Sequence, residues 1–261
     1  MNHLIDEVRK QQPLIHNITN QVVMNFTANG LYAVGAAPVM AHAKEEVEEM
    51  AQIASALLLN IGTLTKEQVD AMVLAGKAAN QAGVPVVLDP VGVGATTFRT
   101  DSAKRILQEV NVTCIRGNAG EIANLAGVGA QVRGVEGSSD IDVQQLASLA
   151  FDTLQVPLAI TGEKDVVIDK NEQVIISNGH PLLTKVTGAG CLLSAVIAAF
   201  LSVSDKVTDA ISGALSYYGV AAENAAEKHQ YPGSFQIAFL DQLFAVDGAE
   251  VNKKKRITRS S

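Results

Sequence analysis

The sequence predicts an α/β fold in which helices cover both faces of a mostly parallel sheet. Apolar runs of strand length, such as residues 56–62 and 84–88, alternate with longer helical segments such as 66–82, which is the order of β-α-β units. The composition agrees, because 48% of the 261 residues are hydrophobic while aromatic residues make up only 4% and Trp is absent. A chain of this length can bury a sizeable core as one large domain.

The N-terminal part of the chain is expected to form helices separated by loops and short extended segments. A helix over 4–12 ends before Pro13, because proline has no backbone N–H and restricts the residue before it. The segments expected after it are a loop over 16–20, a helix over 22–34 that Gly30 interrupts, an extended piece over 36–42 and a helix over 44–54.

In the rest of the chain, one pair of expected strands departs from the parallel pattern. The apolar runs 166–169 and 174–177 are separated by four polar residues, which predicts an antiparallel hairpin added to the sheet. Residues 127–140 are glycine-rich and charged and are expected to form a mobile excursion. The other expected elements are strands over 112–115 and 157–162 and helices over 102–109, 143–154, 207–228 and 234–244.

A glycine motif precedes a long apolar run. Thr187, Gly188, Ala189 and Gly190 follow a predicted loop, and the apolar residues after Cys191 predict a helix that is buried on every face. Glycines allow a tight turn with outward N–H groups, and a helix N-terminus stabilises phosphate charge through those groups and the helix dipole. The motif indicates an anion site, and the alternative is an ordinary glycine turn before a core helix.

Charged and polar residues follow several predicted strands. Asp89 ends one strand and precedes a glycine-rich loop, a position suited to holding a metal ion or polarising a phosphate-bound water. Asn118 and Glu121 share one face of a helical first turn, where Glu121 could order magnesium through water and Arg116 could meet a phosphate. For Asn118 and Glu121 the alternative is a capping pair at an ordinary helix start.

Two residues of the N-terminal part are candidates for contact with a small substrate. Asn25 lies near the start of the predicted helix over 22–34, and its alternative role is that of a helix-surface amide. Met40 lies at the end of the extended piece, where a flexible thioether suits either core filling or the wall of a small heterocycle pocket.

Charge and hydropathy exclude several classes of protein. The formal net charge of −7 and the lack of a concentrated basic face argue against nucleic-acid binding. The basic segment 252–261 is expected to be a solvated tail beyond a single domain over 1–251. No apolar stretch is long enough for a membrane span and no signal-peptide pattern begins the chain, so a cytoplasmic protein is expected. Its two cysteines, Cys114 and Cys191, lack metal spacing and are expected to be free thiols.

In combination, these motifs resemble the ribokinase-like superfamily and, within it, the hydroxyethylthiazole kinase family. The resemblance covers nearly the whole chain and implies a three-layer αβα sandwich. It also implies phosphorylation of the hydroxyl of 4-methyl-5-(2-hydroxyethyl)thiazole by ATP and Mg²⁺, in thiamine salvage. The segments that carry it are His16–Asn20, Pro38–His42, Asp89–Gly92, Arg116–Glu121, Ile160–Gly162 and Val186–Cys191.

The resemblance also implies roles for the candidate residues and an assembly. The family is typically a homotrimer with thiazole pockets between subunits. The implied catalytic residues are Gly188, Gly190 and Cys191. The implied binding residues are Arg116, Thr161, Asn118 and Thr187 for ATP, Met40, Gly188 and Asn25 for the thiazole alcohol, and Asp89 and Glu121 for Mg²⁺.

Cys191 is a departure from the superfamily pattern, in which an Asp at this position is the presumed base. Phosphoryl transfer through a loose transition state demands positioning more than early deprotonation, so a weaker base is tolerable. The helix N-terminus is expected to lower the pKa of the Cys191 thiol. Two alternatives stay open: a nucleotide-binding regulator without efficient chemistry, and a ribokinase-like hydratase or lyase that acts on a modified nucleotide.

Overall fold

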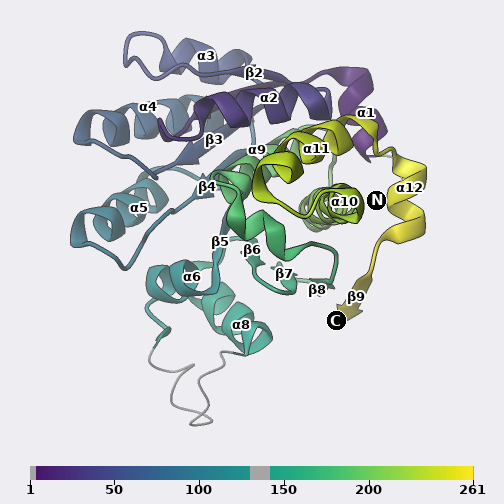
Figure 1. Ribbon diagram of the computed structural model, residues 1–261. Helices are drawn as coiled ribbons and strands as arrows, with labels where there is room; N and C mark the ends of the chain where they lie inside the picture. The colour runs from purple at the N-terminus through teal and green to yellow at the C-terminus, as the bar shows by residue number, and fades with distance from the viewer. Residues whose placement is uncertain (1–3, 130–141, 261) are drawn as a thin grey trace.

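The computed structural model describes residues 4–129 and 142–260, and within them the chain forms a nine-stranded sheet (Figure 1). The strand order is β2-β1-β3-β4-β5-β6-β7-β8-β9, with parallel pairing up to β6 and antiparallel pairing from β6 to β9. The strands are β1 (Leu14–Ile18), β2 (Ala37–Val39), β3 (Ala56–Asn60), β4 (Val86–Asp89), β5 (Cys114–Asn118), β6 (Leu158–Thr161), β7 (Asp165–Ile168), β8 (Gln173–Ile176) and β9 (Ile257–Ser260).

Helices cover both faces of this sheet, which confirms the predicted three-layer αβα architecture. Alternate strand residues face opposite layers, so Leu58 and Val87 belong to one buried cluster while Leu57 and Leu88 belong to the other. One layer holds α1 (Leu4–Gln11), α2 (Met24–Val34), α9 (Ala189–Leu201), α10 (Val207–Lys228), α11 (Pro232–Ala245) and α12 (Gly248–Lys254). The other holds α3 (Val47–Ile53), α4 (Lys66–Ala82), α5 (Thr97–Glu109), α6 (Ala119–Ala126) and α8 (Val143–Leu154).

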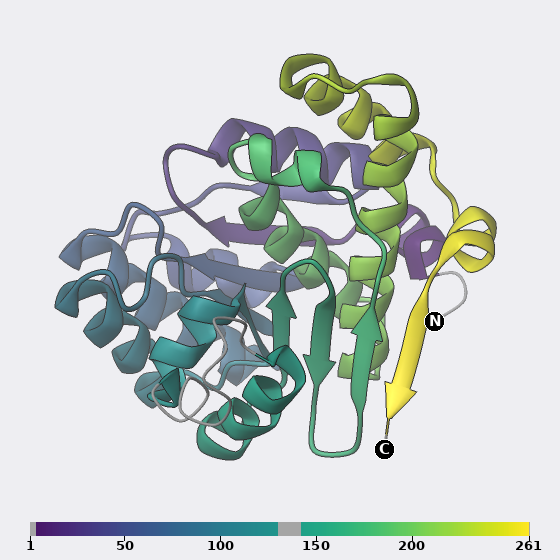
Figure 2. The ribbon, with the colours of Figure 1, turned by 60° about the horizontal axis from the view of Figure 1, so that its bottom comes forward.

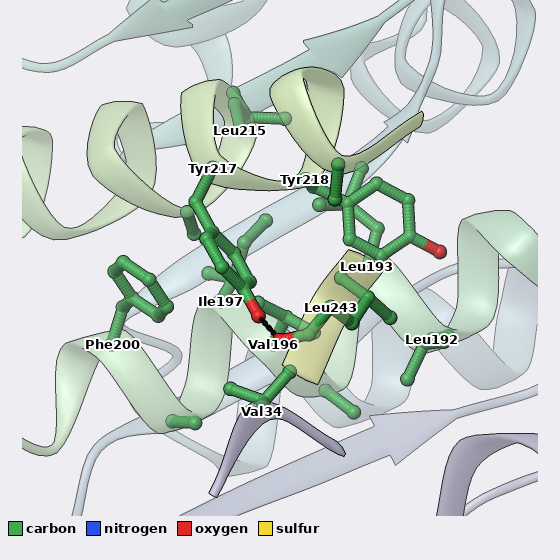
Figure 3. Packing of buried hydrophobic residues seen from close by; sticks show 14 of the residues in the cluster. Val34, Leu192, Leu193, Val196, Ile197, Phe200, Leu215, Tyr217, Tyr218 and Leu243 are labelled. Atoms are coloured by element: carbon green, nitrogen blue, oxygen red, sulfur yellow. Dashed lines mark hydrogen bonds between the residues drawn. The ribbon is translucent and has the colours of Figure 1, made fainter. Parts of the chain in front are cut away.

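Helix α9 is the buried centre of its layer, as the apolar run predicted. Every residue from 192 to 201 is buried, and Figure 3 shows Leu193, Val196 and Ile197 packed against side chains of α10. The Tyr217 hydroxyl donates to the Leu243 carbonyl, and the Tyr218 hydroxyl donates to the Ala189 carbonyl over 2.6 Å. The first of these bonds ties α10 to α11, and the second holds the first turn of α9, where the glycine motif lies.

Gly30 does not interrupt α2, contrary to the expectation. A Cβ built on Gly30 would lie 2.3 Å from Leu192, so glycine at this position lets α2 pack closely on α9. The helix runs unbroken because close packing recovers the small propensity cost of one glycine.

Two further expectations are wrong. Residues 16–18 belong to β1 and are buried, although they were expected in a loop. The segment 252–261 is not simply a solvated tail, because β9 pairs with β8, and Figure 2 shows β9 in yellow along the sheet edge. Arg259 binds Glu172 over 2.6 Å and Asp209 over 2.7 Å, so the basic side chain docks on acidic partners.

Most of the expected excursion over 127–140 lies outside the described residues. The division of the chain into a domain over 1–251 and a tail stays a prediction.

Candidate active site

The carboxyl ends of the parallel strands bring polar side chains to one edge of the sheet. Asn60 and Asp89 end β3 and β4 and are paired in register, and Asn118 and Thr161 end β5 and β6 in the same way. The start of α9 lies at this edge, since Ser194 in its second turn bonds Asp89. In open α/β sheets this edge is where ligands bind.

Arg116 lies beneath the first turn of α9. Its Nη2 donates to the Thr161 hydroxyl over 2.6 Å, and its Nη1 is 3.9 Å from Asp89 Oδ2. A Cβ on Gly190 would lie 2.8 Å from Nη1, so glycine at 190 leaves room for the guanidinium. The structure therefore brings together four residues that the sequence predicted for one site: Asp89, Arg116, Thr161 and Gly190.

Asp89 is a wholly buried carboxylate with one satisfied and one unsatisfied oxygen. Oδ2 accepts hydrogen bonds from Asn60 Nδ2 and Ser194 Oγ, each over 2.8 Å, while Oδ1 has no partner among the described residues. Burial raises the pKa of Asp89 to about 6, and the nearby Arg116 charge opposes that rise. A buried acceptor without a partner is costly, so Oδ1 fits a cation or one of its bound waters.

Cys191 is joined to Asp89 by two asparagine side chains. Asn20 Nδ2 donates to Cys191 Sγ over 3.4 Å and to Asn60 Oδ1 over 2.9 Å, and Asn60 in turn donates to Asp89. Burial, together with the charge of Asp89, raises the pKa of the Cys191 thiol to about 11. The expectation that the helix N-terminus would lower this pKa is wrong, because burial outweighs the dipole, and the thiol is neutral near pH 7.

Asn20, Asn60 and Ser194 were missed as site residues. Asn60 ends a buried strand beside Asp89, and Ser194 is four residues after Gly190, one helical turn on. These positions are the signals that could have found Asn60 and Ser194. For Asn20 the signal was only its place in a segment rich in hydrogen-bonding side chains.

Asn118 and Glu121 form the capping box that the sequence left as the alternative. Asn118 Oδ1 accepts from the Glu121 N–H and Glu121 Oε2 accepts from the Asn118 N–H, both over 2.9 Å. Glu121 Oε1 also accepts the Gly92 N–H over 2.9 Å, which ties α6 to the loop after Asp89. Glu121 thus lies beside that loop. Within residues 4–129 and 142–260, no three or more His, Cys, Asp or Glu side chains are grouped so that they could hold a metal ion by themselves.

Of the residues expected to bind a small substrate, Gly188 lies at the glycine turn, whereas Asn25 and Met40 lie on other segments. Gly188 has φ of +87°, and a Cβ there would lie 2.8 Å from Val23 on the approach to α2. Asn25 is exposed and bonds Asn29, so the described contacts do not bring it to the glycine motif. Met40 is half-buried where the chain leaves β2, and Thr187 is exposed just before Gly188.

The parallel sheet with its antiparallel extension and the glycine turn at a buried central helix identify the fold as ribokinase-like. A ribokinase-like superfamily protein from Enterococcus faecalis V583 superimposes with a TM-score of 0.63 at 12% identity, covering 88% of this chain and 86% of that one, and supports the fold alone.

A model of the hydroxyethylthiazole kinase family matches residues 5–249, and the chain belongs to that family. It is 56% identical over 259 residues to a hydroxyethylthiazole kinase from Halalkalibacterium halodurans, covering 98% of this chain and 99% of that protein. A solved hydroxyethylthiazole kinase protein from Pyrococcus horikoshii OT3 matches with a TM-score of 0.91 at 41% identity, covering 99% of this chain and 98% of the other. Among the described residues, no helix could cross a membrane.

Proposed function

We propose that the chain transfers the terminal phosphoryl group of ATP to the hydroxyl of 4-methyl-5-(2-hydroxyethyl)thiazole. The observation that carries the proposal is the convergence of Arg116, the unpartnered Asp89 Oδ1 and the start of α9 in a member of this kinase family. This arrangement combines a fixed cation, a carboxylate and unpaired helix N–H groups, which are the parts that bind and activate a phosphate donor.

On this proposal, the first turn of α9 and Arg116 bind the phosphates of ATP. Arg116 is held by Thr161 and is oriented toward Gly190, so its guanidinium is fixed before the nucleotide arrives. Asn118 and Thr187 are assigned to the nucleotide as well, because they lie at the end of β5 and just before the glycine turn.

Asp89 and Glu121 are assigned to Mg²⁺, which would neutralise the phosphate charge of the bound nucleotide. Asp89 Oδ1 offers a free carboxylate oxygen, and a nearby cation would favour its ionised form. Glu121 already accepts two backbone N–H groups, so its role is to act through ordered water.

We assign the acceptor alcohol to Met40, Gly188 and Cys191. The side chains of Val23 and Phe26 lie against Gly188 and supply apolar surface for a neutral heterocycle. A neutral Cys191 thiol is a weak base, so it contributes mainly by positioning the hydroxyl, and the proton leaves late in a loose transition state. Gly188 and Gly190 contribute by letting the backbone approach the reacting groups.

We further propose a homotrimer with active sites between subunits. Large apolar side chains are exposed in the helices and in the segments just before them: Val22, Tyr32, Ile53, Phe98, Tyr231, Ile237 and Phe244. Contact between copies would cover such surface. Light scattering after gel filtration tests the proposal, and a monomeric mass at micromolar concentration would contradict it.

A cytoplasmic location stays a prediction from the sequence.

The decisive experiment measures ADP release from ATP when hydroxyethylthiazole is added, with and without Mg²⁺. The proposal expects release that requires both the alcohol and the cation. Nucleotide binding without turnover would indicate the regulator, and consumption of a modified nucleotide without ADP release would indicate the hydratase or lyase. Much faster release with ribose or adenosine would refute the proposed acceptor.

A further inference from the structure

The chain segment around Met40 is held by side chains of β1 beyond the last strand pair. Pairing of β1 with β2 ends at His16 opposite Val39. After that point the ring Nε2 of His16 is 2.9 Å from the Ala41 carbonyl oxygen. Asn17 Nδ2 donates to the carbonyl of Ile15 in its own strand over 2.8 Å and also reaches the Val39 carbonyl over 3.4 Å. Because a carbonyl oxygen can only accept, Nε2 carries the proton.

These two side chains reach the segment from opposite faces of the sheet. Consecutive residues of a strand point to opposite faces, so His16 and Asn17 hold the carbonyls on either side of Met40 from two directions. A third link runs the other way, because His42 Nε2 lies 3.2 Å from the Thr19 carbonyl oxygen. Side-chain contacts therefore hold the backbone both before Met40, at Val39, and after it, at Ala41 and His42.

Burying the polar side chains of His16 and Asn17 lowers the stability of the fold. His16 and Asn17 are wholly buried, and His16 Nδ1 and Asn17 Oδ1 have no partner among the described residues. Apolar side chains at these positions would avoid leaving two buried polar atoms without hydrogen bonds. Core packing therefore does not explain why polar side chains occupy positions 16 and 17. Their hydrogen bonds to the backbone around Met40 explain it better.

We propose that His16 and Asn17 are positioning residues that fix the Met40 segment as a rigid wall for the acceptor alcohol. The inference rests on the proposed function, which places the acceptor against Met40. A fixed wall raises affinity because no backbone has to be ordered when the acceptor binds, and it favours the acceptor whose shape the wall fits. Neither side chain is assigned a contact with the nucleotide.

The sharpest test compares His16→Gln with His16→Asn. Both carry the same amide, but only glutamine is long enough to place an N–H near the position of Nε2. We expect the KM for hydroxyethylthiazole to stay within about threefold of wild type in His16→Gln and to rise at least about tenfold in His16→Asn, a loss of about 1.4 kcal/mol in binding. The KM for ATP should change by less than about twofold in both.

Asn178→Leu is the matched control for the loss of a buried amide. Asn178 is 5% exposed, accepts from the Arg256 N–H over 2.7 Å and donates to the Lys254 carbonyl over 3.0 Å. It holds the C-terminal segment rather than the Met40 segment. We expect Asn178→Leu to lower the melting temperature and to leave the KM for the alcohol unchanged.

Hydrogen exchange of the backbone amides of residues 40–42 gives a second measurement that does not depend on turnover. Exchange there should be at least about tenfold faster in His16→Asn than in Asn178→Leu. Equal exchange, or a KM for the alcohol that does not differ between the two His16 variants, would overturn the inference. If wild type fails to phosphorylate the alcohol, the proposed function fails, and exchange still decides whether His16 fixes the segment.

Discussion

Replacing Asp89 with asparagine is expected to stabilise the fold above about pH 6 while strongly lowering kinase activity. Asp89 is wholly buried, and burial raises its pKa from 3.8 to about 6. An acid whose pKa is raised on folding contributes most to stability below its unfolded pKa, and this contribution is lost as the pH rises through the folded value. The rise corresponds to about 3 kcal/mol, at about 1.4 kcal/mol per pH unit.

The expected gain at pH 8 is smaller than that limit. In Asp89→Asn the bonds from Asn60 and Ser194 can be kept, but an amide N–H takes the place of the unpartnered Oδ1 and is itself unsatisfied. We therefore expect the free energy of unfolding of Asp89→Asn to exceed that of wild type by about 1–2 kcal/mol near pH 8, and by much less near pH 4. Turnover should fall by roughly 10²-fold or more, because a carboxylate is lost from the proposed cation site.

Urea unfolding of both proteins at several pH values between about 4 and 8 measures this difference. The difference between the two curves is needed because burial also raises the pKa of Asp165 to about 6 and lowers the pKa of His16, so the wild-type curve alone contains other titrations besides that of Asp89. A difference that stays constant with pH, or an Asp89→Asn variant that is less stable near pH 8, would refute the reasoning.

The remaining predictions concern residues around the glycine turn. Arg116→Ala should raise the KM for ATP at least about tenfold and lower the melting temperature more near pH 8 than near pH 5, because ionised Asp89 loses its neighbouring cation; an unchanged KM would contradict it. Cys191→Ala should slow turnover by roughly tenfold, whereas Cys191→Asp should keep activity because Asn20 can donate to the carboxylate; rapid-quench kinetics at saturating ATP measures both, and an unfolded Cys191→Asp would show a packing role instead. Gly188→Ala should cost about 1–3 kcal/mol in urea unfolding, because φ of +87° and contact with Val23 both oppose a side chain; an unchanged unfolding curve would refute this.

Much of the fold was predictable because helices and buried strands carry their period in the local sequence. The helices over 143–154 and 207–228 have the predicted bounds, and the antiparallel hairpin forms where polar residues separate two apolar runs. The periodicity of the sequence did not reveal that His16 and Asn17 lie in a buried strand. His16 is buried with a distant backbone partner at Ala41, and Asn17 is buried with one local partner at Ile15 and one distant partner at Val39. The same holds for Arg259, whose partners Glu172 and Asp209 are far away in sequence.

The site was predictable where a strand end or a glycine turn marks it. Asp89 and Thr161 follow from strand ends and from the family resemblance. Arg116 was expected just after a strand that ends at residue 115, whereas β5 continues to Asn118 and Arg116 lies in its middle; the structure still brings the three residues together. The pKa of Cys191 could not be predicted from the sequence, because its helix N-terminus and its burial act in opposite directions and only packing decides which is larger. Asn20 became visible only through its contacts with Cys191 and Asn60.

The two outer strands of the sheet limit the ways in which copies of the chain could aggregate. An open strand edge is a template for pairing with another molecule, and natural sheets protect their edges by keeping them short or charged. At one margin β2 has only three residues, and at the other β9 carries Arg259 and covers β8, whose Val174 and Ile176 are buried. Removal of β9 would leave the backbone N–H and C=O groups along one side of β8 unpaired, next to an apolar strand. A chain without β9 should therefore form intermolecular β-structure during refolding more readily than the full chain.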